Sequence, residues 1–270
     1  MSFISNARLY SVTPEIEATW QALLAHVADE AGVPLLYTPY PAPQPLEPLW
    51  SRPDLGCVFM CGYPVALHMF DVVPLAAPVP GAQWAQNQPV YRSDFIVRRD
   101  SPFQTLQDTF GHRFGWTVAH SHSGFNAPRR HLLQYRTPER PALFGEATGN
   151  LVTARAVLDA VVAGAIDVGP LDSYWHLLVA RHRPELAAGI RVVESTALAP
   201  VPAFVASPGL GAAPIARLRA VFASASGRPW FAPLAEVLCI ERFAVARTSC
   251  FARTLVWDQE AHAAGYAVIA

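Results

Sequence analysis

The sequence predicts an α/β fold that is divided into two lobes. Apolar segments of strand length alternate with amphipathic segments of helical length, which is typical of a mainly parallel sheet with helices on both faces. The chain also has 270 residues, of which 52% are hydrophobic, and this supports two cores more readily than one. We therefore expect two α/β lobes, each with a mainly parallel sheet flanked by helices.

The first lobe opens with a predicted strand and a well-marked helix. The apolar segment Ala7 to Val12 is expected to be the strand. Thr13 is a favourable N-cap residue, Pro14 suits the first helical position, and Gly32 marks the helix end. Further strands are expected at residues 34–37, 55–60 and 72–76, with a proline-rich loop at 38–48.

Two extended segments are typical of connections between lobes. They are residues 91–99 and 195–202. They predict that residues 1–92 plus 199–270 form lobe I and residues 93–198 form lobe II. A chain that leaves its first lobe and returns makes two hinge crossings, and such lobes close on a ligand. We therefore expect a small molecule in the cleft between the lobes.

The turn that follows the strand near Gly115 is the strongest candidate for a binding site. It contains Ser121, His122, Ser123 and Gly124, and a helix is expected to start at residue 127. The first N–H groups of a helix lack acceptors and carry a partial positive charge, so a hydroxyl-rich turn at that point can surround an oxyanion. Alternatively, the serines only cap the helix. The residues themselves leave both interpretations open.

Three other side chains are candidates for contact with a ligand. Asp172 either caps the helix that follows it or holds a cationic group of the ligand. Tyr40, in the proline-rich loop, is available to a cleft, and His131 adds positive potential near the turn. His120, His122 and His131 lack a carboxylate or thiolate companion at ligand spacing, so we expect no metal site.

Composition and motifs exclude several classes of function. A net charge of −1 and a pI of about 6.7 show no excess of positive charge that would favour binding to nucleic acid or to an anionic membrane surface. No apolar run reaches the length of a membrane span, so no membrane insertion is expected. No phosphate-binding glycine loop or catalytic motif occurs, so we expect no cofactor and no catalytic residues.

The N-terminal residues bear on the expected compartment. Residues 1–10 lack the basic and apolar regions of a secretory signal. The sequence as written therefore predicts a cytoplasmic protein, and a periplasmic one if the N-terminus is truncated.

Four segments together resemble the phosphate/phosphite/phosphonate-binding proteins of ABC transporters. They are SDFIVRRDSPFQTLQD (93–108), RFGWTV (113–118), SHSGFNAP (121–128) and GAIDVGPLDSY (164–174). The resemblance covers about residues 5–205. It implies the type 2 periplasmic-binding-protein fold, with two α/β lobes around a cleft and two hinge crossings.

The resemblance also implies a set of ligand-binding residues. The oxyanion would lie on the polar turn, where His122 replaces a small hydroxyl residue of the family. An acidic residue would meet the amino or protonated end of the ligand, aromatic residues of lobe I would contact it, and a histidine is a further candidate. The residues of the polar turn are Ser121, His122, Ser123 and Gly124, and the acidic residue is Asp172. The aromatic residues are Tyr40 and Tyr63, and the histidine is His131.

The resemblance favours a small-molecule binding protein, with a phosphate- or phosphonate-like oxyanion as ligand and an ABC-transporter permease as a possible partner. No nucleophile–base pair is recognisable, which also favours a non-catalytic role. One alternative is a cytoplasmic enzyme on the same fold, of the menaquinone- or thiamine-precursor lyase or synthase type. Its acid–base groups would be His122, His131 and Asp172. The other alternative is an intracellular sensor whose closure is read by a partner protein.

Overall fold

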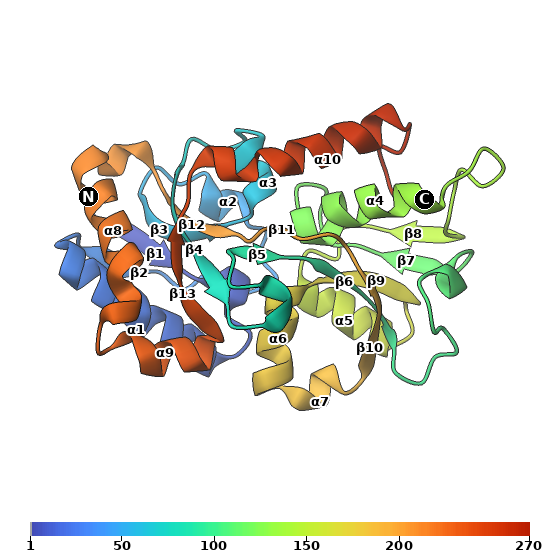
Figure 1. The fold of residues 1–270 in the computed structure, drawn as a ribbon, viewed down its shortest axis with the longest axis horizontal. Coiled ribbons are helices and arrows are strands. Elements are labelled where there is room, and N and C mark those ends of the chain that lie inside the picture. The colour runs from blue at the N-terminus through green and yellow to red at the C-terminus, as the bar shows by residue number, and fades with distance from the viewer. Residues whose placement is uncertain (1) are drawn as a thin grey trace. The chain divides into compact units, whose positions relative to one another are not determined.

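The computed structural model describes residues 2–270, which form two compact units (Figure 1). Unit 1 contains the chain up to Tyr91 and Pro200–Ala252, and unit 2 contains Arg92–Ala199 and Arg253–Ala270. Two of the three connections between the units lie within one residue of the predicted lobe boundaries. The third connection, after Ala252, was not predicted. Residues 253–270, which are expected in lobe I, pack in unit 2.

Unit 1 is built on a six-stranded mixed sheet. In spatial order its strands are β13 (Ile240–Val245), β4 (Val73–Pro80), β12 (Ala203–Ala206), β3 (Leu55–Met60), β1 (Phe3–Asn6) and β2 (Leu35–Tyr37). β1 is parallel to β2 and β3, whereas β12 is antiparallel to β3 and β4, and β13 is antiparallel to β4. β12 starts beside the carboxyl end of β3, where Ala203 pairs with Met60, and it must therefore run in the opposite direction.

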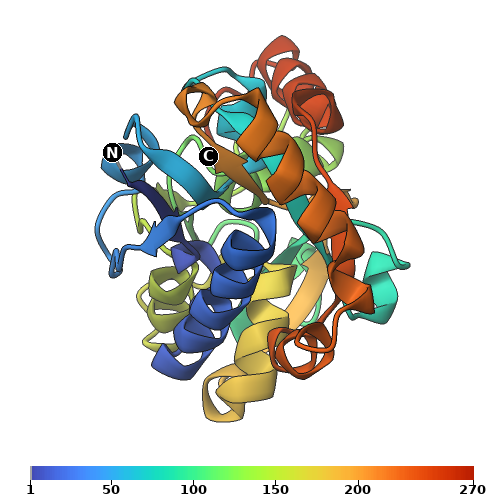
Figure 2. The same cartoon turned by 90° about the vertical axis from the view of Figure 1, so that its left-hand side faces the viewer.

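Helices pack against this sheet. They are α1 (Pro14–Ala31), α2 (Glu47–Trp50), α3 (Gly62–Ala66), α8 (Ala212–Ser224) and α9 (Phe231–Leu238). The predicted ends of α1 are confirmed: Thr13 Oγ1 accepts a hydrogen bond from the Ile16 amide at 3.3 Å, and Gly32 has φ of 59°. α1 and α8 lie side by side (Figure 2), and the Trp20 ring packs edge-on against Phe59 in the core at 5.1 Å.

The prediction of a strand at Ala7–Val12 is wrong. β1 ends at Asn6, whose side-chain oxygen accepts a hydrogen bond from the Arg8 amide at 2.9 Å. Asparagine readily bonds to the backbone two residues ahead, and this favours a turn. A short 3₁₀ helix (Arg8–Tyr10) therefore follows β1.

Unit 2 is built on a five-stranded mixed sheet. Its strands, in spatial order, are β10 (Ile190–Ser195), β6 (Ser93–Arg98), β9 (Val168–Asp172), β7 (Arg113–Gly115) and β8 (Glu146–Thr148). β7 is parallel to β8 and β9, and β6 is antiparallel to β9 and β10. The helices are α4 (Ala127–Leu132), α5 (Ala154–Val162), α6 (Ser173–His182), α7 (Pro184–Ala187) and most of α10 (Ala252–Ala263).

The strands that adjoin the crossings explain why both sheets contain more antiparallel pairs than predicted. β6 starts beside the carboxyl end of β9, where Ser93 pairs with Asp172. β5 (Val90–Tyr91) and β11 (Ala199–Pro200) form a separate two-stranded sheet. None of the helices in residues 2–270 is long and apolar enough to span a membrane.

The C-terminal segment is held in unit 2 by Arg129 of α4, whose side chain is 2% exposed. Its guanidinium pairs with Asp258 of α10, and Arg129 Nη1 donates a hydrogen bond to the Ala267 carbonyl at 2.7 Å. The centre of the Phe125 ring lies 4.8 Å from the guanidinium carbon of Arg129. A buried charge needs such partners, because an unpaired ion in the interior is costly.

Two ion pairs between α4 and α10 allow a matched test of this anchor. Asp258→Ala removes the carboxylate that faces buried Arg129, so we expect it to lower the free energy of unfolding by roughly 3 kcal/mol. Glu260→Ala removes the exposed partner of Arg130 and should cost less than about 1 kcal/mol. Denaturant unfolding of both variants measures the difference, and equal losses would contradict the anchoring role of Arg129.

Candidate functional site

The polar turn of unit 2 is the beginning of a helix. A π-helical turn (His122–Asn126) continues directly into α4, so the helical segment spans eleven residues and starts five residues before the predicted position. Ser121 is its N-cap, and its Oγ accepts a hydrogen bond from the Gly124 amide at 3.0 Å. The capping interpretation of Ser121 is thus confirmed.

Ser123 lies in the first helical turn and is partly exposed. Within residues 2–270 its hydroxyl makes no hydrogen bond, and N–H groups at this point of a helix lack intrahelical acceptors. The helix dipole adds a partial positive charge. Ser123 therefore offers a hydroxyl donor to a negatively charged group.

Gly124 is required because there is no room for a side chain. A Cβ atom at this position would lie 1.9 Å from Thr117 Oγ1 and 2.9 Å from Ser121 Oγ. The Thr117 side chain is buried, and its hydroxyl has no hydrogen-bond partner among the described residues. Thr117 is not recognisable as part of the site from the sequence, because nothing in the local pattern shows that it packs under the turn.

His122 points into the interior of unit 2. It is 1% exposed, its ring stacks on Trp257 of α10 at 5.2 Å, and its Nδ1 lies 3.2 Å from Asn126 Nδ2. Burial lowers the pKa of His122 to about 3, so the ring is neutral near pH 7. In this structure His122 packs the turn onto α10, and this position does not support the predicted contact with an oxyanion.

Asn126 extends the contact between the turn and α10. Its Nδ2 donates a hydrogen bond to the Thr254 carbonyl at 2.8 Å, and its Oδ1 accepts one from Arg129 Nη2 at 3.1 Å. Asn126 thus joins the turn to the C-terminal helix α10. No sequence pattern indicated this support, because residues 254 and 126 are 128 positions apart.

Asp172 ends β9 and caps α6. Its Oδ1 accepts hydrogen bonds from the amides of Tyr174 at 2.9 Å and Trp175 at 3.0 Å, which confirms the capping interpretation. β9 is parallel to β7, and carboxyl ends of parallel strands share one edge of a sheet. Asp172 and the turn after β7 therefore leave the unit 2 sheet at the same edge, and β9 contacts the π-helical turn directly.

His131 lies in a cluster of unit 2 with Glu194 and Tyr135. Its Nε2 lies 2.6 Å from Glu194 Oε1, which also accepts a hydrogen bond from the Tyr135 hydroxyl at 2.7 Å. Burial, together with this hydrogen bond to Glu194, raises the pKa of Tyr135 to about 12. The structure therefore gives His131 a partner on β10.

Tyr40 and Tyr63 belong to unit 1. The Tyr40 hydroxyl donates a hydrogen bond to the Pro45 carbonyl at 2.7 Å, and the Arg8 guanidinium lies 5.4 Å from the centre of its ring. Tyr63 is buried in α3. Among residues 2–270, no three His, Cys, Asp or Glu side chains are grouped so as to hold a metal ion.

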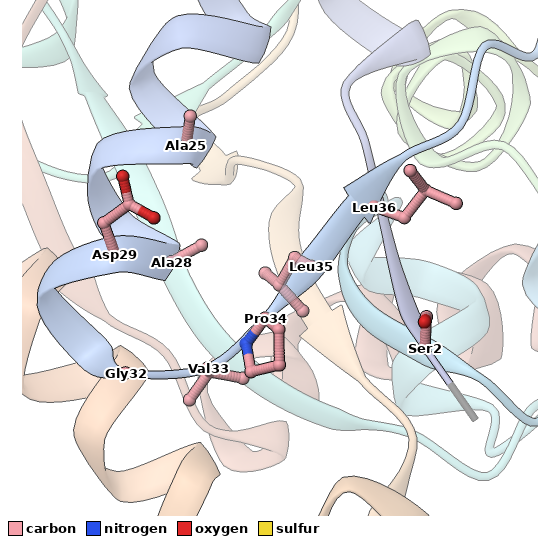
Figure 3. A pocket seen from close by; sticks show the side chains of 9 residues that line it. All are labelled: Ser2, Ala25, Ala28, Asp29, Gly32, Val33, Pro34, Leu35 and Leu36. Atoms are coloured by element: carbon pink, nitrogen blue, oxygen red, sulfur yellow. The ribbon is translucent and has the colours of Figure 1, made fainter.

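A pocket of about 520 Å³ lies elsewhere in unit 1, between the end of α1 and β2 (Figure 3). Asp29 is the one charged side chain that lines it, beside apolar groups such as Pro34 and Leu36. A carboxylate repels an oxyanion, so this pocket is a poor match to the predicted ligand.

The buried position of His122 predicts a pH effect on stability. Below about pH 6.5 the unfolded chain takes up a proton at this histidine, whereas the folded protein does so only near pH 3, so acid favours unfolding between these values. We expect His122→Phe to lose about 2 kcal/mol less stability than the wild type between pH 7 and pH 5. Denaturant unfolding at both pH values measures this. His68→Asn, at an exposed histidine with φ of 53°, is the control, and an unchanged pH dependence in His122→Phe would refute the prediction.

The close approach of Thr117 predicts that Gly124→Ala is destabilising. We expect a loss of about 1–3 kcal/mol, because the new methyl group meets Thr117 Oγ1. Part of this loss should return in the double variant with Thr117→Ala, as a double-mutant cycle would show. Gly227→Ala, where no atom lies within 4 Å of the added Cβ, is the control. Equal effects of the two glycine substitutions would rule out the steric explanation.

Comparisons with solved structures show the same fold. A binding protein component of an ABC phosphonate transporter from Pseudomonas aeruginosa is 16% identical, with a TM-score of 0.78, over 98% of this chain and 88% of that chain. PhnD1 from Prochlorococcus marinus in complex with methylphosphonate is 15% identical, with a TM-score of 0.78, over 97% and 98% of the two chains. A Xanthomonas citri protein bound to ATP is 20% identical, with a TM-score of 0.66, over 99% and 100%.

These similarities confirm the two-lobed α/β periplasmic-binding-protein fold. None of the curated proteins matches the sequence. A family model described as "ABC transporter, phosphonate, periplasmic substrate-binding protein" matches residues 11–249, which is most of the chain. With the helical turn and the fold described above, this match confirms the predicted resemblance: the chain belongs to the family of periplasmic phosphonate substrate-binding proteins of ABC transporters.

Proposed function

We propose that this protein binds a small phosphonate or phosphate through the turn Ser121–Gly124 of unit 2. The observation that carries the proposal is the Ser123 hydroxyl, which is partly exposed and makes no hydrogen bond within residues 2–270 although it lies at the start of a helix. Family membership supports the same class of ligand. The relative from Prochlorococcus marinus was solved with methylphosphonate, which gives a first ligand to test.

The chemistry of the turn suits an anion with several oxygen atoms. Ser121 Oγ accepts the Gly124 amide, but its own O–H hydrogen is still available as a donor. The Ser123 hydroxyl supplies another donor, and the N–H groups and dipole of the eleven-residue helical segment add positive potential. Hydrogen bonds to a charged acceptor are roughly twice as strong as those between neutral groups.

Asp172 supports a preference among phosphonates. It leaves the unit 2 sheet at the same edge as the turn, and its Oδ1 accepts two amide hydrogen bonds from the first turn of α6. A negative charge near the bound anion favours a ligand that also carries an amino group. We therefore propose an aminoalkylphosphonate as a better ligand than a simple alkylphosphonate.

Family membership also defines the setting of this function. Proteins of this family serve ABC transporters, so a small ligand and a permease are the implied partners. We propose that the protein delivers its ligand to such a permease from the periplasmic side of the membrane. The family match favours this role over the enzyme alternative, and no feature of the described residues favours the sensor alternative.

A thermal-shift screen tests the proposal. The panel contains phosphate, phosphite, methyl- and aminoethylphosphonate, sulfate, taurine and thiamine-pathway pyrimidines. A ligand at about 100 times its dissociation constant should stabilise the protein by roughly 2.7 kcal/mol, which raises the melting temperature by a few degrees. We expect the phosphorus oxyanions to give this shift, aminoethylphosphonate at the lowest concentration.

Two serine variants connect the screen to the turn. Ser123→Ala should abolish most of the shift, because it removes a donor to the anion. Ser249→Ala, at an exposed serine of unit 1, should leave the shift unchanged. If no oxyanion stabilises the wild type, or if Ser123→Ala responds as the wild type does, the proposed site is wrong. A response to the pyrimidines alone would favour the enzyme alternative.

A further inference from the structure

Arg8 of unit 1 has an unusual environment for a guanidinium group. Its Nη1 is buried and has no hydrogen-bond partner, and none of its side-chain nitrogens forms an ion pair or a hydrogen bond within residues 2–270. The contact of the group is with the face of the Tyr40 ring, at 5.4 Å. An arginine normally directs five N–H donors at acceptors, so this side chain retains its donor capacity.

Other arginines with a buried nitrogen differ from Arg8 in this respect. Arg129 Nε and Arg191 Nε are also buried without a partner, but both guanidinium groups are bonded through their other nitrogens. Arg129 bonds to Asn126, Asp258 and the Ala267 carbonyl. Arg191 bonds to the carbonyl groups of Ser101 and Phe103. The fold thus satisfies those two arginines and leaves Arg8 without acceptors.

The position of Arg8 in unit 1 is one where small molecules bind in α/β folds. Arg8 begins the 3₁₀ helix after β1, and β1 is parallel to both β2 and β3. The carboxyl ends of these strands share one edge of the sheet, which is the usual location of a ligand site. Asn6 Nδ2 donates a hydrogen bond to the Thr38 carbonyl at 2.8 Å and fixes the loops after β1 and β2 together.

The charge balance around Arg8 favours an added anion. Desolvation by burial lowers the pKa of Arg8, and it outweighs the opposite effects of Tyr40 and Glu47. The group still carries its positive charge at neutral pH. A partly desolvated cation with unused donors gains more from an anion than one in water does, because the lower dielectric strengthens the attraction.

We propose that Arg8 is an anion-binding residue of unit 1, which takes a phosphonate, phosphate or carboxylate group of a small-molecule ligand. The inference deepens the proposed function and rests on it, since it requires an anionic ligand. Tyr40 then holds the guanidinium plane from one face, while its N–H edge is available to the ligand. This assigns Tyr40, predicted to touch the ligand, the role of a positioning residue.

Arg8→Met tests the inference, because methionine keeps an unbranched apolar stem and removes the charge. The control is Arg217→Met in the same unit, whose Nε donates a hydrogen bond to the Ala31 carbonyl at the end of α1, at 2.7 Å. Calorimetric titration with methylphosphonate and with phosphonoacetate measures affinity. We expect at least a tenfold loss in Arg8→Met and less than a twofold loss in Arg217→Met.

The melting temperature of the ligand-free proteins provides a second readout. Replacing an arginine with a purely structural role would lower this temperature. Because the fold gives Arg8 no acceptor, Arg8→Met should melt at the same temperature as the wild type or higher. Arg217→Met should melt at a lower temperature, since it loses a hydrogen bond. Arg8→Lys, which keeps the charge but not the fork of donors, should lie between the wild type and Arg8→Met in affinity.

The outcomes separate this inference from the proposed function. If Arg8→Met binds within twofold of the wild type, or melts as low as Arg217→Met with unchanged affinity, the role of Arg8 is overturned while the Ser123 site stands. If the wild type binds no phosphorus oxyanion, the proposed function fails. If a carboxylate or sulfonate then binds to the wild type and binds more weakly to Arg8→Met, the role of Arg8 is still supported. If the wild type binds none of the anions, both the role of Arg8 and the proposed function are overturned.

Discussion

The burial of the Arg129 charge is the constraint on which unit 2 depends. Its guanidinium reaches Asn126 in the turn, Asp258 in α10 and the Ala267 carbonyl near the end of the chain, so one side chain fixes three segments. A cation that is 2% exposed is tolerated only where such partners surround it. The position of the start of the candidate binding helix therefore depends on the contact between α4 and α10.

The two candidate ligand residues have unused hydrogen-bonding capacity, which they share with a few buried groups such as the Thr117 hydroxyl but not with most of the polar interior. Asp94, for example, is satisfied by the Arg92 guanidinium, the His176 ring and the Ser195 hydroxyl, at 3.2, 3.1 and 2.7 Å. The Ser123 hydroxyl and the Arg8 guanidinium have no comparable partners in residues 2–270. Folded proteins pair nearly all buried polar groups, so the unpartnered Arg8 Nη1 calls for an explanation, whereas the Ser123 hydroxyl is partly exposed.

Local signals in the sequence predicted much of the fold. Thr13 and Gly32 defined α1 because capping is decided within a few residues, and the apolar segment 55–60 matches β3 at both ends. The capping role of Ser121 was predicted for the same reason, although the helix starts five residues before the predicted position. The docking of α10 was not, because its buried positions include only one large side chain, Trp257, and its partners lie in another part of the chain. The inward rotation of His122 depends on that docking, so a local pattern gives no indication of it.

The return of residues 253–270 to unit 2 has a consequence for biosynthesis. The bond between Asn126 and the Thr254 carbonyl joins residues 128 positions apart, and all of unit 1 that follows Ala199 is synthesised between them. A ribosome releases the chain from its N-terminus, and contacts of long sequence separation form late. The support behind the ligand turn can thus be completed only after Thr254 has been synthesised, so a nascent chain is expected to hold all the residues of the turn before it is able to bind.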